Sequence, residues 1–192
     1  EWYEERYGYR PKSAEVLSLA IGQGPNSQTV LRMAHFFSAL AGNGAAPSPH
    51  LVAGEASSEG AIDLQLSSEQ LEQVWEGLAK VVQPGGTAVL SPLATWHIYG
   101  KTGTAQNPPH PDHGWFVGFS GKPGGSPEIV VAAIIEHGLS GSDVAPLAAK
   151  VINHYLSRKH GLPVDPQPTY IERLESGRVA GYDSYPAPLH PG

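Results

Sequence analysis

The chain has 192 residues, of which 40% are hydrophobic, and a formal net charge of −6 at pH 7. This composition supports one ordinary globular core and excludes a wholly disordered chain. The densest basic cluster, residues 157–160, is too short for a nucleic-acid surface and is typical of the basic end of a helix. The absence of cysteine excludes disulfides and thiolate metal sites, and no apolar run approaches the ~18 residues that span a bilayer.

The first part of the chain has the weakest pattern. Residues 1–10 mix aromatic and charged side chains without a clear period. The apolar run that follows, residues 17–21, is broken by Gly22 and Gly24. We expect this run to be extended and to enter a turn at the glycines.

Three segments have a helical pattern. In residues 29–42 apolar side chains recur at three- and four-residue spacing. Residues 68–82 follow the clearest helix start, because Ser67 and Gln70 can form a capping box. Residues 142–157 carry a third apolar stripe, so we predict helices over these three ranges.

Strands are predicted between the second and third helices. Residues 95–102 alternate apolar and polar side chains, and residues 114–120 are rich in aromatic ones. Residues 128–136 form a near-continuous apolar run, which is typical of a central strand. Residues 45–66 look like a loop with a short strand at Leu51-Val52. The expected fold class is α+β, with an antiparallel sheet flanked by helices.

The chain becomes rich in proline after Gly161. Such a composition is typical of linkers and weakly structured tails. We therefore predict that residues 1–160 form the folded domain and that residues 161–192 form a Pro-rich tail.

The sequence GKTGTAQ at residues 100–106 carries the strongest chemical signal. A phosphate-binding P-loop would need glycine at position 95 and a helix after the lysine. Position 95 is Thr95, and the prolines at 108, 109 and 111 exclude a helix interior. A dinucleotide fingerprint starting at Gly22 would need a third glycine at position 27, which is Ser27. The sequence therefore fits neither a P-loop nor a dinucleotide-binding motif, and we expect no cofactor.

On a strand, the same residues can form an anion site. Successive side chains alternate faces, so Thr102 and Thr104 point the same way, beside the ammonium of Lys101. Gly103 lets a ligand approach the backbone closely. Charge-assisted hydrogen bonds of this kind contribute roughly 1.5–3 kcal/mol each. Lys-Thr-Gly is also one of three motifs, with Ser-x-x-Lys and Ser-Asp-Asn, found in penicillin-binding proteins and class A β-lactamases.

Other polar residues have a simpler interpretation. The run His110-Pro111-Asp112-His113 could supply metal ligands. The intervening proline and the lack of further clustered ligands favour an ordinary loop instead. We expect no metal site. Glu136 could act as a general base, but a carboxylate at the end of a strand is usually solvated.

The aromatic residues after the motif allow two interpretations. One interpretation is that these side chains form a platform on which a ligand packs. The other, which we favour, is that they belong to the core of the sheet; the residues are Trp115, Phe116 and Phe119. Trp115 could still border a cleft, because it follows the loop after the lysine strand. Gln23 is interpreted as structural.

Six stretches occur in a fixed order along the chain: LSLAIGQGPNSQTVLRMAHFFSALAGNG, VVQPGGTA, YGKTGTAQ, GWFVGFSG, PEIVVAAIIEHG and VAPLAAKVINHYL. Together they resemble the C-terminal part of the transpeptidase domain of class B penicillin-binding proteins, over about residues 1–158. The AIGQG stretch and the preceding EWYEERYGYRPKSAEVLSL most resemble the elongation-type penicillin-binding protein 2.

This resemblance implies a peptidoglycan D,D-transpeptidase that cross-links stem peptides through an acyl-enzyme, in a membrane-associated protein on the extracytoplasmic side of the bacterial cytoplasmic membrane. By the same resemblance, Lys101, Thr102, Gly103 and Thr104 bind the terminal carboxylate of a stem peptide or β-lactam. Lys101 is then a catalytic residue, and the backbone N–H of Thr104 supplies half of the oxyanion hole. Other proteins of cell-wall elongation are implied as partners.

Two motifs of the family are missing. No serine is followed by lysine three residues later; Ser157 comes nearest, with His160 in place of lysine. No asparagine has serine or tyrosine two residues before it. In the family both motifs precede the Lys-Thr-Gly strand, so the resemblance implies a further partner, the missing N-terminal part of the same domain, and an incomplete sheet edge. The alternatives are a catalytically silent binding or assembly module and a β-lactam-hydrolysing or sensing relative.

The missing nucleophile leads to a first prediction. A labelled penicillin should leave no covalent adduct on these 192 residues alone, because acyl transfer needs a nucleophile and a base within hydrogen-bond reach. Mass spectrometry of the heat-denatured chain checks this. A stoichiometric adduct would show that another side chain attacks the β-lactam ring.

Overall fold

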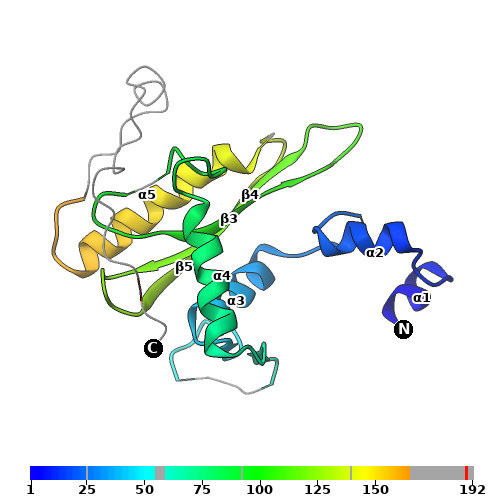
Figure 1. The fold of residues 1–192 in the computed structure, drawn as a ribbon, viewed down its shortest axis with the longest axis horizontal. Coiled ribbons are helices and arrows are strands. Elements are labelled where there is room, and N and C mark those ends of the chain that lie inside the picture. Colours follow the sequence, from blue (N-terminus) through cyan, green and yellow to red (C-terminus); the bar gives the residue numbers. More distant parts are fainter. Residues whose placement is uncertain (25, 55–58, 92, 139, 165–188, 190–192) are drawn as a thin grey trace.

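A computed structural model gives the fold and describes residues 1–24, 26–54, 59–91, 93–138, 140–164 and 189. Its centre is an antiparallel sheet in the order β3-β4-β5, built from β3 (Tyr99–Ala105), β4 (His113–Gly121) and β5 (Pro127–Ile135). Helix α5 (Gly141–Lys159) covers one face, whereas α3 (Val30–Ala41) and α4 (Ser68–Lys80) cover the other (Figure 1). The predicted α+β fold class is confirmed.

Strand β4 lies between two apolar layers because its side chains alternate. Phe116 belongs to the cluster that contains Val144 and Ile152 of α5. Val117 and Phe119 belong to the cluster that includes residues of α3 and α4. Both phenylalanines are fully buried, which confirms the prediction that they form core.

The three predicted helices are confirmed within two residues at each end, and their caps explain where they begin. The N–H of Arg32 donates to the hydroxyl of Thr29 at 3.2 Å, in front of α3. The predicted capping box precedes α4: Gln70 N–H donates to Ser67 Oγ at 3.2 Å, and Ser67 N–H donates to Gln70 Oε1 at 2.9 Å.

The observed strand β3 is shifted toward the C-terminus relative to the predicted strand at residues 95–102. The ladder with β4 begins only at Tyr99 and continues to Ala105. Before the ladder begins, the Ser120 hydroxyl of β4 donates to the carbonyl of His97 at 2.9 Å. Trp96, His97 and Ile98 are buried in front of the strand.

The predictions for two other regions were wrong. The apolar run at residues 17–21 is largely helical, within α2 (Ser13–Ala20), which follows α1 (Trp2–Tyr7). Glu15 fixes the first turn of α2 by accepting a hydrogen bond from the Lys12 N–H at 2.7 Å. Leu51-Val52 is not a strand; the short pair is β1 (Ala45–Ala46) with β2 (Ile62–Asp63).

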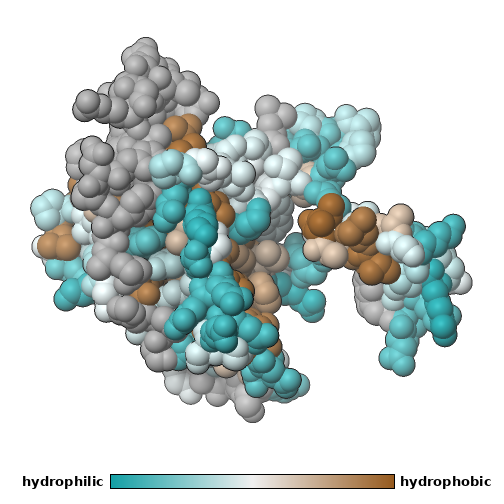
Figure 2. Space-filling model, in the orientation of Figure 1, coloured by the Kyte–Doolittle hydropathy of each residue, from teal (hydrophilic) through white to brown (hydrophobic). Residues whose placement is uncertain are grey.

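Helices α1 and α2 stand apart from the sheet (Figure 1). No residue of α2 is buried, and the side of this helix that faces the main body is hydrophobic (Figure 2). Val16, Leu17 and Ile21 are 52%, 66% and 70% exposed. This apolar face has no partner among the residues that the structure describes.

Beyond residue 164, the proposed tail is described at one residue only. Leu189 is 3% exposed within the α3–α4 cluster, and its N–H donates to the hydroxyl of Tyr99 at 2.9 Å. The rest of the tail from residue 165 onward lies outside the described residues, so its boundary stays a prediction. Across the described chain, no helix is long and apolar enough to cross a membrane.

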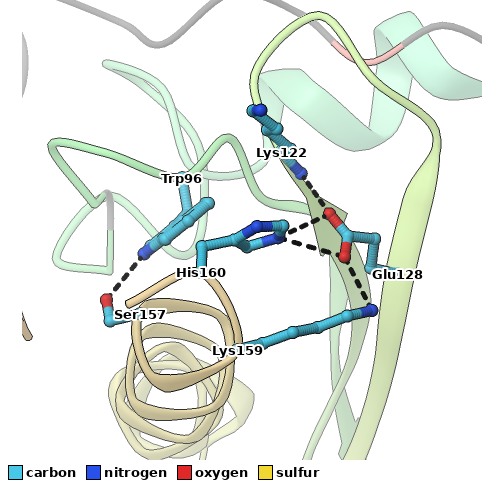
Figure 3. A network of polar contacts seen from close by, with 6 residues as sticks. All are labelled: Trp96, Lys122, Glu128, Ser157, Lys159 and His160. Atoms are coloured by element: carbon cyan, nitrogen blue, oxygen red, sulfur yellow. Dashed lines mark hydrogen bonds and ion pairs between the residues drawn. The ribbon is translucent and has the colours of Figure 1, made fainter. Parts of the chain in front are cut away.

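A polar network ties the end of α5 to the β4–β5 hairpin (Figure 3). Glu128 of β5 accepts from Lys159 Nζ at 2.7 Å and from the Lys122 N–H at 3.0 Å, and its Oε1 lies 3.0 Å from His160 Nε2. Burial alone raises the pKa of the Glu128 carboxyl, but these hydrogen bonds outweigh it, and the pKa lies below its ordinary value.

This network predicts a pH-dependent stability. The pKa of the Glu128 carboxyl is lower in the folded state than its ordinary value of 4.5. The contribution of Glu128 to the free energy of unfolding is therefore present in full above pH 4.5, and it is lost as the pH falls through the folded pKa. At pH 7, Glu128→Gln should lower the free energy of unfolding by about 1–2 kcal/mol. The difference from the parent should shrink below the ordinary carboxyl pKa.

Urea unfolding at several pH values measures this effect. Glu136→Gln is the matched control, since Glu136 is exposed and should change stability by less than about 0.5 kcal/mol. Equal effects of the two substitutions at pH 7 would contradict a role for the network.

Candidate functional site

The candidate site lies on the open edge of β3. This strand pairs with β4 on one side and has no strand beside it on the other among the described residues. The carbonyl of Thr104 accepts from Gln23 Nε2 at 2.9 Å, and the carbonyl of Thr102 accepts from Lys101 Nζ at 2.8 Å. Both residues therefore turn their backbone polar groups away from β4.

The same geometry fixes where the backbone donors point. In an antiparallel ladder, a residue that does not bond to its partner strand directs both its N–H and its C=O outward. The N–H groups of Thr102 and Thr104 thus face the open edge. Their two carbonyls are already covered by Lys101 and Gln23, so the edge presents mainly donors to a ligand.

The two threonine side chains share one face of the strand, as the alternation predicted. Thr102 Oγ1 lies 2.6 Å from Thr87 Oγ1, in the loop after α4. Thr104 Oγ1 accepts a long hydrogen bond of 3.5 Å from the N–H of Gly141, in the first turn of α5. Lys101 lies on the opposite face, opposite Val117 of β4, and its ammonium folds back over the edge.

The N-terminus of α5 packs directly against the strands. A Cβ on Gly141 would lie 2.5 Å from the carbonyl oxygens of both Gly103 and Trp115. Only glycine allows this contact, which brings the first turn of the helix against Thr104. The partial positive charge of a helix N-terminus adds to the positive potential of this edge.

Lys101 gives the edge its formal charge. Its side chain is exposed, and no carboxylate forms an ion pair with it among the described residues. An ammonium and two outward N–H groups, with hydroxyls beside them, favour an anion with several acceptor atoms, such as a carboxylate.

A pocket of about 290 Å³ opens beside this edge. Its walls come from residues 101–105 of β3, from Trp115 of β4, and from Gln23, Asn26 and Phe37 on and before α3. None of its described lining residues is serine, cysteine or histidine. The polar side chains that β3 contributes to this pocket are those of Lys101, Thr102 and Thr104.

Two residues contact the motif from other segments. Gln23 was interpreted as structural, and its amide donates to the Thr104 carbonyl beside the pocket. Thr87 was seen only as part of VVQPGGTA, yet it contacts the Thr102 hydroxyl. Neither spacing nor periodicity could place them, because 81 and 15 residues separate them from their partners.

The other candidates lie outside the pocket or at its border. Trp115 lines the pocket, as one interpretation suggested. The ring of His113 lies 5.0 Å from that of His137, and its Nδ1 accepts from the His137 N–H. Glu136 is exposed at the end of β5. Neither His113 nor Glu136 reaches the pocket lining.

Comparisons with known proteins show the family to which the chain is similar. Residues 3–153 match the family described as penicillin binding protein transpeptidase domain. The chain is 29% identical to the peptidoglycan D,D-transpeptidase MrdA of Acinetobacter baumannii, over 86% of this chain and 28% of that protein. The chain therefore spans less than a third of the length of this curated relative.

Solved structures with the same fold include two proteins called PBP2. The Pseudomonas aeruginosa protein, in complex with WCK 5153, is 31% identical with a TM-score of 0.66, over 84% of this chain and 38% of that one. The Helicobacter pylori protein is 25% identical with a TM-score of 0.67, over 83% and 30%.

The outward direction of the Thr104 N–H can be tested with proline. Thr104→Pro removes a donor that β4 does not use, so the free energy of unfolding should fall by less than about 1 kcal/mol. Gly103→Pro is the matched control; it removes a ladder hydrogen bond and should cost about 3 kcal/mol or more. Thermal melts compare the two. If both variants lose the same stability, the Thr104 N–H is part of the ladder.

Proposed function

The chain belongs to the penicillin-binding protein transpeptidase domain family, and we propose that it supplies the substrate-binding edge of a peptidoglycan D,D-transpeptidase. The observation that carries this proposal is the donor-rich edge of β3, where Lys101, Thr102 and Thr104 converge without a carboxylate partner. Such an edge suits the terminal carboxylate of a stem peptide.

Each residue has a distinct role in this proposal. Lys101 and the hydroxyls of Thr102 and Thr104 bind the carboxylate of the acyl donor, while Gly103 leaves room for its backbone. The Thr104 N–H donates to the carbonyl oxygen of the scissile bond as that oxygen becomes negative. A donor aimed at developing charge lowers the barrier more than one that binds ground state and transition state equally.

The nucleophile comes from outside these 192 residues. We infer that a segment carrying Ser-x-x-Lys brings its serine to the open edge of β3. The apolar face of α2, with Val16, Leu17 and Ile21 exposed, adjoins this edge through the Gln23 contact. Burying that face would fix both α2 and the incoming segment. The missing part of the same domain is thus the first partner.

The remaining expectations follow from the same role. Cross-linked peptidoglycan lies outside the cytoplasmic membrane, so the chain would work on the extracytoplasmic side as part of a membrane-associated protein. A β-lactam presents a carboxylate beside a reactive carbonyl and would bind the same edge. Cell-wall elongation proteins are proposed as partners because of the likeness to PBP2 and MrdA proteins.

A second candidate function is a catalytically silent binding module. It is favoured by one observation, the lack of serine, cysteine and histidine among the described pocket residues. The sequence of the parent gene distinguishes the two candidate functions. A Ser-x-x-Lys motif upstream in the same reading frame supports the enzyme, and the absence of such a motif supports the silent module.

Lys101 provides the kinetic test in the complete domain. Lys101→Ala removes a charge-assisted contact of roughly 1.5–3 kcal/mol, so the second-order constant of β-lactam acylation should fall about 10- to 150-fold. Lys101→Arg keeps the charge but changes the donor geometry, so it should restore activity only in part.

Lys122→Ala is the matched control, because Lys122 is exposed and is not among the residues that line the pocket. Thermal melts accompany the kinetics and separate loss of binding from loss of fold. A folded Lys101→Ala protein that acylates at the parental rate would contradict the proposed role of the edge.

A further inference from the structure

The loop after α4 places a second hydroxyl against the lysine strand. Thr87 Oγ1 lies 2.6 Å from Thr102 Oγ1, and Thr102 is the only hydrogen-bond partner of the Thr87 side chain in the part of the chain that the structure describes. Such a distance is at the short end of the range for O–H···O hydrogen bonds. Thr102 lines the pocket beside β3, whereas Thr87 does not. Thr87 therefore reaches a ligand in this pocket through Thr102.

The backbone on both sides of Thr87 is fixed to the end of α4. The N–H of Gly86 donates to the carbonyl of Gln83, and the N–H of Ala88 donates to the carbonyl of Val81, both at 2.8 Å. Ala88 is buried in the apolar cluster that includes residues of α5. The hydroxyl of Thr87 is thus held in one place before a ligand binds, although its side chain is exposed.

The contact between the two hydroxyls has two proton arrangements, because each hydroxyl has one proton and two lone pairs. If Thr102 donates to Thr87, Thr102 Oγ1 presents only lone pairs to a ligand, and lone pairs repel an anion. If Thr87 donates to Thr102, the proton of Thr102 stays free to donate into the pocket. A carboxylate accepts hydrogen bonds and donates none, so it fits the second arrangement alone.

The second arrangement also strengthens the bond to the ligand. A hydroxyl that accepts a hydrogen bond becomes a better donor, so the bonds from Thr87 to Thr102 and from Thr102 to a carboxylate support each other. The ammonium of Lys101 lies 2.8 Å from the carbonyl oxygen of the same threonine and adds its charge beside this chain of bonds. A neutral carboxamide has donors as well as an acceptor, fits either arrangement, and gains less from Thr87.

We propose that Thr87 is a positioning residue that sets the preference of the β3 edge for a peptide with a free C-terminal carboxylate. Thr87 donates to Thr102 Oγ1 and thereby directs the proton of Thr102 toward the ligand. This role rests on the proposed function, because Thr87 acts only on a ligand that binds Thr102. Recognition of the carboxylate then depends on a hydroxyl outside the Lys-Thr-Gly motif, in the loop after α4.

Two peptides test this role on the whole chain: one ends in D-Ala-D-Ala, and the other is the same peptide with a C-terminal carboxamide. Fluorescence anisotropy of the peptides, labelled at their N-termini, gives both affinities. Thr87→Val removes the hydroxyl and keeps the shape of the side chain. The affinity for the carboxylate peptide should fall about 3- to 10-fold, and that for the carboxamide peptide by less than about twofold. Thr87→Ser is the matched control; it keeps the hydroxyl and should bind both peptides like the parent.

The variant Thr102→Val separates an effect through Thr102 from a general effect on the loop. In this background Thr87→Val should change the affinity for the carboxylate peptide by less than about twofold, because the acceptor of the Thr87 proton is gone. Three results would overturn the role of Thr87 and leave the proposed function intact: an unchanged preference in Thr87→Val, an equal loss in Thr87→Ser, or a loss that persists in the Thr102→Val background. A parent chain that binds both peptides equally would overturn the proposed function and the role of Thr87 with it.

Discussion

The single-sided pairing of β3 is the constraint on which the candidate site depends. Because β4 uses one edge of this strand, the register decides which backbone groups face outward, and these are the groups of Thr102 and Thr104. The side chains of Lys101 and Gln23 then cover the two outward carbonyls. The remaining donors, the ammonium and the hydroxyls are the groups that bind an anion in the proposed function.

The rest of the fold holds this edge in place from three directions. The first turn of α5 packs against Gly103 and Trp115 through Gly141. The ring of Tyr99 stacks on Phe119 at 5.2 Å and fixes the start of β3. In the loop after α4, Gly86 packs against the carbonyl of Val81 so closely that a Cβ would not fit. The next residue, Thr87, contacts Thr102. Such support keeps a binding site in one geometry before a ligand arrives.

Much of the architecture could be predicted from the sequence because it depends on local pattern. The capping residues Ser67 and Gln70 mark the start of α4, and the apolar run at 128–136 marks β5. Phe116 and Phe119 were correctly assigned to the core. The motif itself placed Lys101, Thr102 and Thr104 on a strand.

What the sequence could not supply depends on contacts between distant segments. The start of β3 at Tyr99 follows from its pairing with β4 and from the hydrogen bond of Ser120 to the carbonyl of His97, which no local pattern reveals. Gln23 and Leu189 reach β3 from 81 and 90 residues away, so only the fold brings them there.

The most direct test of the account is binding of a peptide that ends in D-Ala-D-Ala to the chain labelled with nitrogen-15. This measurement needs no nucleophile. The account predicts that the amide signals of Thr102 and Thr104 shift on titration, and that the same peptide with a C-terminal carboxamide leaves them unchanged. Equal shifts with the carboxamide peptide, or shifts confined to other parts of the chain, would contradict a carboxylate site on β3.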